Sequence, residues 1–282
     1  MLLNSFTFHA PKTIGELTGL YSKLENARLQ AGGTFLLNQL KLLKRNGAKT
    51  PQHIISLQKI NELKGISVEG NALVIKSMTA ISDIYSHKQV AERLPLLKLV
   101  CKNISTQPIR NMATIGGNLT CRYTWTEMPA VTVGLGAKLY FIDESLKEQI
   151  IDPEEFFKNA AKTGLVLTKI SFPLDPATRT AYRRVKKSQF VDIPLLSLII
   201  RTTIKGTRFT DTRVALNNCV EFAQRDYALE EFLNSQPISA RLGQEALDHI
   251  TETIYDKRSS DYKKHMFRLS LKQAVNELTQ NI

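Results

Sequence analysis

The sequence predicts an α+β protein with a boundary between two domains near residue 176, and three observations support this class. A strand pattern over 28–31 leads through a Gly-Gly turn into an apolar-faced helix over 35–43. A strand–turn–strand pattern over 66–78 predicts a β-hairpin. After the stretch 173–176, which contains two prolines, three strand patterns follow one another and helical patterns complete the chain. Runs of strands followed by runs of helices are typical of α+β domains.

The N-terminal part, about residues 1–52, is predicted to form a first lobe that begins with a helix. Thr13 and Glu16 have the spacing of a capping box, and apolar residues then recur at helical spacing as far as Leu24. Residues 53–175 are predicted to form a second lobe. Its expected elements are strands over 54–57, 66–68, 73–78, 138–142 and 165–172, a short helix capped by Thr79, and a mostly helical segment over 90–104 despite Pro95.

Residues 176–282 are predicted to form a C-terminal domain in which an antiparallel meander is followed by helices. Strand patterns cover 181–187, 195–204 and 209–216, and the pattern becomes helical from Asp226 onward. In the last helix four apolar side chains share one face, which is typical of packing against a core: Phe267, Leu271, Ala274 and Leu278.

The composition excludes several kinds of chemistry. The chain has 282 residues, of which 43% are hydrophobic, and this suits a globular protein with a substantial core. Its three cysteines form no CxxC pair, whereas an iron–sulfur cluster usually needs four thiolates. No HExxH, Walker or GxGxxG motif is present, so redox chemistry would require an organic cofactor or a partner. No apolar run reaches the roughly 20 residues of a membrane span, and we expect a cytoplasmic protein.

The formal net charge of +12 raises nucleic acid as a partner, but its distribution argues against a dedicated binding arm. Residues 1–175 carry 21 basic and 14 acidic side chains, and residues 176–282 carry 17 and 12, so both parts share the excess. The densest basic cluster lies within 179–187. It is interpreted either as a solvated strand face or as an anion site or partner surface.

Two Gly-Gly pairs are the best candidates for a ligand site, Gly32–Gly33 and Gly116–Gly117. Paired glycines let the backbone approach a ligand closely, and consecutive amide groups can form an anion-binding nest. A helix that begins just after Thr34 would add the positive end of its dipole. Each pair alone is more typical of a plain turn, but two such turns can clamp a diphosphate from both sides.

The amino-acid sequence around these turns resembles that of the FAD-binding medium subunit of the molybdenum hydroxylases, a family that includes xanthine dehydrogenase and carbon monoxide dehydrogenase. The resemblance covers nearly the whole chain. The segments that carry it are 8–17 (FHAPKTIGEL), 29–37 (LQAGGTFLL), 58–65 (QKINELKG), 73–80 (LVIKSMTA), 107–118 (QPIRNMATIGGN), 127–130 (EMPA), 182–187 (YRRVKK), 191–194 (VDIP) and 259–265 (SSDYKKH).

The resemblance implies a two-lobed FAD-binding domain of the vanillyl-alcohol-oxidase (PCMH) type over 1–175 and a C-terminal domain over 176–282 with a small antiparallel sheet and helices. It implies that residues 31–36 hold the FAD diphosphate and that the second glycine segment contacts diphosphate and ribityl atoms. It also places the strand over 182–187 near the isoalloxazine ring. The implied cofactor-binding residues are Leu29, Ala31, Gly32, Gly33, Thr34, Phe35, Leu36, Ile104, Thr114, Gly116, Gly117, Asn118, Cys121, Glu127, Arg183 and Lys186.

This chain departs from the family pattern at three places. Phe35 stands where the family usually has a polar or acidic residue, and Glu127 stands where it usually has Asp. The stretch 122–125 replaces a segment of small residues and proline. Within it, Tyr123 or Trp125 can stack on flavin or on a partner, or can simply pack against the domain.

The function implied by the resemblance is electron transfer by an FAD-containing oxidoreductase subunit, with no catalytic side chain of its own because the flavin performs the chemistry. Electrons would arrive from [2Fe-2S] clusters on a small subunit, molybdopterin would reside on a large subunit, and NAD or another acceptor would take the electrons. The expected assembly is a dimer of heterotrimers, without nucleic acid and without a membrane span. Two alternatives remain: a stand-alone FAD-dependent oxidoreductase of the same fold, and a basic nucleic-acid-binding domain.

Overall fold

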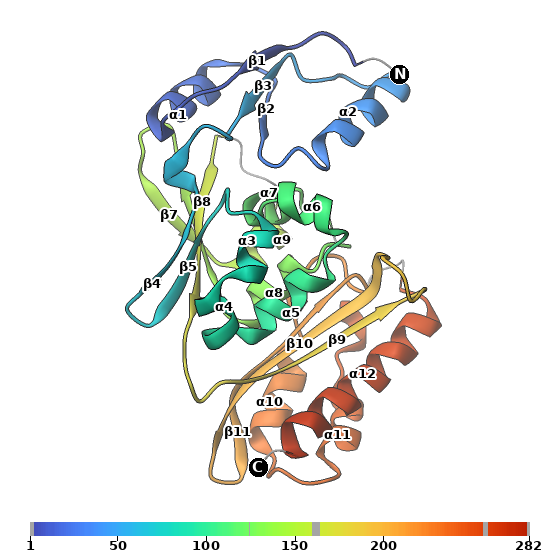
Figure 1. Ribbon diagram of the computed structural model, residues 1–282. Helices are drawn as coiled ribbons and strands as arrows, with labels where there is room; N and C mark the ends of the chain where they lie inside the picture. The colour runs from blue at the N-terminus through green and yellow to red at the C-terminus, as the bar shows by residue number, and fades with distance from the viewer. Residues whose placement is uncertain (1–2, 124, 160–163, 256–258, 281–282) are drawn as a thin grey trace.

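The computed structural model describes residues 3–123, 125–159, 164–255 and 259–280, and these residues form three β-sheets flanked by helices (Figure 1). One sheet is parallel and has three strands, one is antiparallel and has five, and one is antiparallel and has four. None of the described helices is both long and apolar enough to cross a membrane.

The first lobe is a small parallel sheet with the strand order β1-β3-β2. The predicted cap of its first helix is confirmed, because the Thr13 hydroxyl accepts a hydrogen bond from the Glu16 amide at 3.1 Å. The central strand β3 buries Ile54 and Ile55, so this lobe extends past residue 52, its expected end. The elements are β1 (Thr7–His9), α1 (Ile14–Lys23), β2 (Ala27–Gln30), α2 (Leu36–Arg45) and β3 (His53–Ser56).

The second lobe is built on an antiparallel sheet with the order β4-β5-β8-β6-β7. The predicted hairpin is confirmed by the pairing of β4 with β5. Its strands are β4 (Ile66–Glu69), β5 (Ala72–Lys76), β6 (Lys138–Ile142), β7 (Glu148–Ile151) and β8 (Val166–Pro173). Its helices are η1 (Asn61–Leu63), α3 (Ile81–Ser86), α4 (Lys88–Arg93), α5 (Pro95–Asn103), α6 (Gln107–Met112), α7 (Ile115–Thr120), α8 (Met128–Gly134) and α9 (Pro153–Lys158).

The prediction of a mostly helical segment over 90–104 is confirmed, with one interruption at Leu94 between α4 and α5. Pro95 opens α5, where its missing N–H costs nothing. One local prediction in this lobe is wrong, because Thr79 does not cap α3, whose N-cap is Ala80. Instead the Thr79 hydroxyl accepts from the Gly65 amide at 3.1 Å and donates to the Gly65 carbonyl at 3.0 Å. Thr79 therefore joins the end of β5 to the start of β4.

The C-terminal domain confirms the predicted α+β pattern, with a meander in the order β12-β11-β10-β9 covered by helices. The four apolar residues predicted to form one stripe on the last helix are all buried. The strands are β9 (Arg179–Lys186), β10 (Pro194–Lys205), β11 (Arg208–Asn217) and β12 (Gln224–Arg225). The helices are α10 (Tyr227–Ser235), α11 (Leu242–Glu245), η2 (Ala246–His249), η3 (Glu252–Ile254) and α12 (Asp261–Gln280).

Helix α8 connects the second lobe with the C-terminal sheet. All of its residues are buried, and it packs against β10 and β11. A Cβ atom built on Gly134 would lie 2.7 Å from Cγ2 of Ile199 on β10, so the helix reaches the sheet at van der Waals distance. Ile199 and Ala215 consequently belong to the same hydrophobic core as the second lobe.

Gly134→Ala is expected to destabilise the protein, because the added methyl group overlaps Ile199 in a close-packed core and such overpacking typically costs about 1–3 kcal/mol. Gly19→Ala is the matched control, since a Cβ atom at Gly19 in α1 meets nothing within 4 Å. Alanine should stabilise that helix by roughly 0.5–1 kcal/mol. Urea unfolding followed by circular dichroism measures both changes. A Gly134→Ala variant as stable as the wild type would contradict the close packing of α8 on β10.

Candidate functional site

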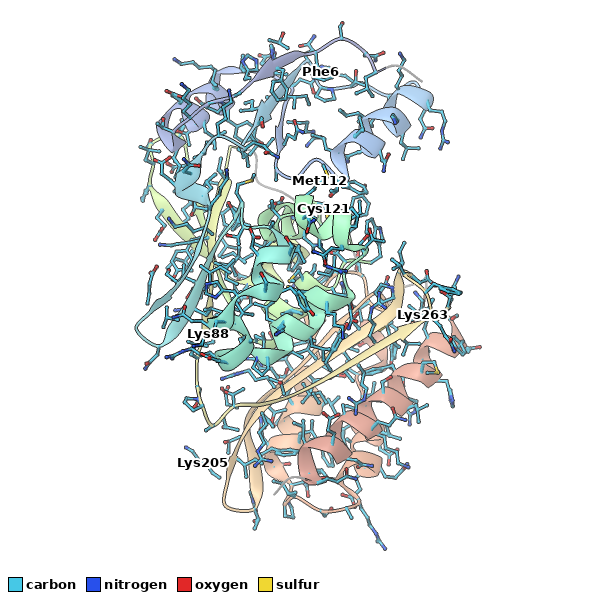
Figure 2. All side chains as sticks on the ribbon, in the orientation of Figure 1. Phe6, Lys88, Met112, Cys121, Lys205 and Lys263 are labelled. Carbon is cyan, nitrogen blue, oxygen red and sulfur yellow. The ribbon has the colours of Figure 1, made fainter. Side chains whose placement is uncertain are left out.

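The two glycine pairs of the sequence lie against each other in the structure. We call residues 31–36, which lead from β2 into α2, the first loop, and residues 112–118, which lead from α6 into α7, the second loop. A Cβ atom on Gly32 would lie 1.9 Å from the Met112 carbonyl oxygen, and one on Gly117 would lie 3.3 Å from Cβ of Ala31. No side chain fits at position 32. Figure 2 labels Met112 and Cys121 at this junction between the two lobes.

The first loop retains free hydrogen-bond donors. Among the described residues, the amides of Gly32, Gly33 and Thr34 have no hydrogen-bond partner. Gly33 has φ of +72°, the left-handed conformation that glycine adopts without strain. Helix α2 starts immediately afterwards, and the side chain of its N-cap residue, Phe35, forms no capping hydrogen bond. The loop therefore presents amides and the positive end of a ten-residue helix, a combination that favours an anion.

The second loop differs from the expected anion nest, because its consecutive amides already donate within the protein. Ile115 donates to the Thr79 carbonyl at 3.1 Å, and Gly116 donates to the Ser77 carbonyl at 2.8 Å. The amides of Gly117 and Asn118 donate to the hydroxyl and the carbonyl of Thr114, respectively. The prediction of a nest at this loop is therefore wrong. The glycines here allow α7 to dock closely on the connection from β5 to α3.

The second loop still offers one side chain with unused hydrogen-bonding capacity. The side-chain oxygen Oδ1 of Asn118 is buried and has no hydrogen-bond partner among the described residues. The same holds for the hydroxyl of Ser77, which lies under Gly116. A buried polar atom without a hydrogen-bond partner destabilises a folded protein. These two atoms are therefore suited to a polar ligand that lies between the loops. Ser77 was missed as a site residue, because it lies within the strand predicted over 73–78, whereas the observed strand β5 ends at Lys76.

Three flanking residues from the predicted set lie beside the loops with their side chains engaged elsewhere. Leu29 packs against the core of the first lobe, and Ile104 packs against that of the second. The thiol of Cys121 donates to the Asn118 carbonyl at 3.0 Å, and burial raises its pKa. Their contact with a cofactor stays a prediction.

The sequence departures Phe35, Tyr123 and Trp125 form one aromatic cluster. The ring of Phe35 lies 4.5 Å from that of Tyr123 and 5.8 Å from that of Trp125, measured between centroids. Tyr123 and Trp125 are themselves 5.1 Å apart. Tilted rings at these distances attract one another. The two departures from the family pattern are therefore coupled, since the aromatic residue at position 35 packs against the aromatic residues of 122–125.

Glu127 lies at the junction between the second lobe and the C-terminal sheet. It is the N-cap residue of α8 and is only 4% exposed. Its carboxylate accepts hydrogen bonds from the Tyr182 hydroxyl and from Nε of Arg184, the latter at 2.8 Å. Burial raises the pKa of Glu127, and the bonds from Tyr182 and Arg184 oppose this shift. The pKa of Tyr182 is raised by burial and by the neighbouring carboxylate.

The side-chain alternation of β9 separates the basic residues of this strand. Arg184 points toward Glu127, whereas Arg183 points to the opposite face and forms an ion pair with Glu277 of α12 at 2.5 Å. Lys186 donates to two carbonyl groups of the β9–β10 connection at 3.0 Å. The structure thus brings Lys186 to the side of Glu127 and places Arg183 away from it. Arg184 was predicted as a member of the basic cluster over 179–187 but not among the implied cofactor-binding residues, and strand periodicity would have placed it on the same face as Lys186.

The described part of the chain offers no resident metal centre. No group of three or more His, Cys, Asp and Glu side chains is arranged there to hold a metal ion. Cys101, Cys121 and Cys219 form no disulfide bond with one another.

Comparison with known proteins identifies the class that this fold and site define. Residues 4–175 match the family model of the FAD binding domain in molybdopterin dehydrogenase, and the match ends where the sequence predicts the first domain to end. The chain belongs to this family. It is an FAD-binding oxidoreductase subunit of the molybdenum hydroxylase family, which confirms the resemblance found in its sequence.

Individual relatives are similar over nearly the whole chain. The carbon monoxide dehydrogenase medium chain of Hydrogenophaga pseudoflava is 30% identical over 286 residues and covers 98% of each chain. The xanthine dehydrogenase FAD-binding subunit of Escherichia coli O157:H7 is 22% identical and covers 96% of this chain and 95% of its own. A solved structure of the Hydrogenophaga carbon monoxide dehydrogenase superposes with a TM-score of 0.89 at 29% identity and covers 98% of both chains.

Arg184→Met is expected to destabilise the protein strongly, because it leaves the buried Glu127 carboxylate without its cation. Breaking a buried ion pair by removing one partner typically costs about 3–5 kcal/mol. Arg183→Met is the matched control on the adjacent position. The side chains of Arg183 and Glu277 are 25% and 48% exposed. Ion pairs with such exposure contribute about 1 kcal/mol or less to the free energy of unfolding. Urea unfolding of both variants tests the contrast, and equal losses would contradict the assigned role of Glu127.

Proposed function

We propose that the diphosphate of FAD binds where the first and second loops meet. The observation that carries this proposal is the set of unpartnered amides at Gly32, Gly33 and Thr34 among the described residues, in a loop that touches the second loop, which carries the unpartnered Oδ1 of Asn118. The amides and the α2 N-terminus favour the negative diphosphate, and Asn118 accepts a hydrogen bond from a ribityl hydroxyl. Ala31, Phe35 and Leu36 of the first loop and Thr114, Gly116 and Gly117 of the second loop shape the walls. Leu29, Ile104 and Cys121 lie at the margins.

The isoalloxazine ring is proposed to lie toward β9, where Glu127 and Arg184 form the buried pair described above. The guanidinium of Arg184 and the ammonium of Lys186 provide positive charge on that side, which stabilises an anionic reduced flavin. Arg183 is proposed to act only indirectly, since it braces α12 against β9. Bound FAD supplies the conversion between one-electron and two-electron transfer, and the chain contributes position, charge and exclusion of water.

The wider role that we propose is electron transfer from [2Fe-2S] clusters on a small partner subunit to NAD or another acceptor, with molybdopterin on a large partner subunit. The names of the relatives, such as "medium chain", support a complex of several subunits. The β9–β10 connection supports a partner contact, because Phe190, Val191 and Ile193 are 82%, 62% and 54% exposed. A dimer of heterotrimers in the cytoplasm is the proposed assembly.

Gly33→Asp is expected to abolish FAD binding, because it places a carboxylate against the diphosphate. Gly33→Asn is the matched control with the same size and the same positive φ, and asparagine tolerates that conformation better than most residues. Trp125 is the only tryptophan of the chain, so quenching of its fluorescence during FAD titration measures the affinity. We expect a loss of at least a hundredfold for Asp and a much smaller loss for Asn. Equal affinity of Asp and wild type would contradict this position for the diphosphate.

The partner and the acceptor need separate measurements. Co-expression with the neighbouring genes should yield a complex that contains molybdenum, iron and FAD, and the purified chain alone should be yellow. Under anaerobic conditions, chemically reduced FAD-loaded protein should be reoxidised by NAD+. Yellow protein that forms no complex would support the stand-alone oxidoreductase, and protein that cannot be loaded with FAD would refute both flavin functions.

A further inference from the structure

Three arginines lie side by side across the C-terminal sheet. Arg201 on β10 is the direct register partner of Arg213 on β11, and Arg225 lies on the next strand, β12. The two outer arginines are neutralised: Arg201 pairs with Asp211 at 2.7 Å, and Arg225 donates to both carboxylate oxygens of Glu230. The row therefore holds three cations and two acids.

The middle arginine, Arg213, has no such partner. Its Nε is buried and forms no hydrogen bond within the described part of the chain. One side of its guanidinium lies against the backbone, because a Cβ atom built on Gly136 would be 3.0 Å from Cζ. Burial and the positive charges of Arg225 and Arg201 lower its pKa, and Asp211 and Glu230 oppose the shift less strongly. A cation in this setting would be stabilised by an anion that the chain itself does not supply.

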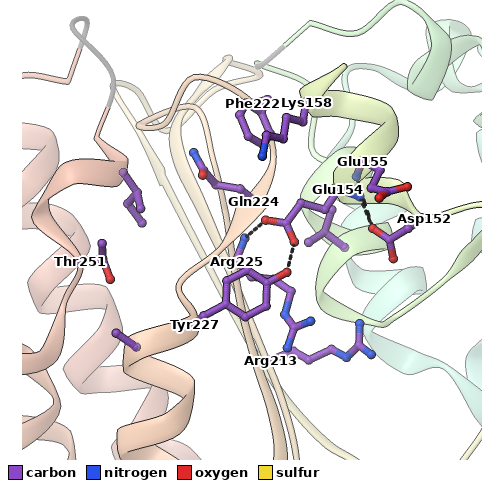
Figure 3. Close-up of a pocket in the computed structure, with 13 residues that line it drawn as sticks. Asp152, Glu154, Glu155, Lys158, Arg213, Phe222, Gln224, Arg225, Tyr227 and Thr251 are labelled. Atoms are coloured by element: carbon purple, nitrogen blue, oxygen red, sulfur yellow. Dashed lines mark hydrogen bonds between the residues drawn. The ribbon is translucent and has the colours of Figure 1, made fainter. Parts of the chain in front are cut away.

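Arg213 forms part of the wall of a cavity of about 550 Å³ between α9, β12 and α10 (Figure 3). Two of the acidic side chains in the wall are already engaged. Glu154 accepts from the Arg225 amide at 3.0 Å and from the Tyr227 hydroxyl at 2.6 Å, and Asp152 caps α9. Glu155 is exposed, and Lys158 lies one turn farther along α9. Asp152 and Glu154 are thus turned to internal partners, whereas Arg213 in the same wall forms no ion pair in the part of the chain that the structure describes.

We propose that this cavity binds the oxyanion, a carboxylate or a phosphate, of a small molecule, with Arg213 as the anchor. A planar guanidinium forms paired hydrogen bonds with either group. The cavity volume exceeds that of a single ion, and the rings of Phe222 and Tyr227 in its wall accommodate an organic part of the ligand. The site is separate from the two glycine loops, so it does not depend on the proposed position of FAD.

The test uses the full chain loaded with FAD, so that the diphosphate site is filled. Inorganic phosphate and malonate are titrated separately by isothermal calorimetry, with sodium chloride holding the ionic strength constant. We expect saturable binding of at least one probe, and the tighter one distinguishes a phosphate from a carboxylate ligand. Arg213→Met should weaken this binding at least tenfold, whereas Arg208→Met, at an exposed position of the same strand, should leave it unchanged.

Two further measurements keep the proposal falsifiable. Gln224→Glu, which adds negative charge to the cavity wall and leaves Arg213 in place, should also weaken binding at least tenfold. Without added anion, Arg213→Met should unfold at the same temperature as wild type or at a higher one, because a half-buried cation without an ion-pair partner has been removed. The absence of saturable binding by both probes would overturn the proposal, as would wild-type affinity in Arg213→Met.

Discussion

The contact between the first and the second loop is the constraint on which the rest of the structure depends. It is a backbone contact, because Gly32 meets the Met112 carbonyl so closely that even a methyl group is excluded. The lobes are held together behind this contact by a shared core, in which Ile142 and Val166 of the second lobe pack with Leu17 and Ile55 of the first. The relative position of the two loops is therefore set before any cofactor binds.

Because of this contact, the two loops have different roles: the second loop is a support and the first loop provides hydrogen-bond donors. The second loop uses its amides to fasten α7 to the β5–α3 connection, which makes it a rigid support. The first loop leaves its amides open beside that support. A ligand that bridges them meets one loop whose amides are already used and one loop whose amides are still available as donors. The preorganised donors lose little conformational entropy on binding, which is the usual physical source of tight cofactor affinity.

A buried charge joins this site to the C-terminal domain. Glu127 occupies the N-cap position of the helix that fills the junction, and its carboxylate reaches Tyr182 and Arg184 on β9 instead of capping the helix. Burying an ion pair rarely adds net stability, so its value lies in fixing the position of β9 relative to α8. The glutamate, one methylene longer than the aspartate usual in the family, spans this distance with its own side chain.

Periodic elements were the part of the fold that the sequence predicted well, because their signal is local. The hairpin, the meander and the buried face of α12 follow directly from apolar spacing. The strands β1 and β12, of three and two residues, are too short for a periodic signal and were missed, as was β7. The glycine pairs were found from the sequence. That the Gly116 amide already donates a hydrogen bond was not, because its acceptor, the Ser77 carbonyl, lies in another segment of the chain. The coupling of Phe35 to Tyr123 is likewise visible only after the loops meet.

The net charge of +12 illustrates why composition was a poor guide to partners. In the densest basic cluster, strand alternation directs Arg184 inward to Glu127 and Arg183 to Glu277, while Lys186 binds carbonyl groups. These cations are engaged within the structure and leave no continuous basic face on that strand for nucleic acid. What matters for binding is charge that the fold holds away from solvent and leaves without an ion-pair partner. Along the arginine row of the C-terminal sheet, the half-buried Arg213 fits that description, and it lies outside the basic cluster of residues 179–187.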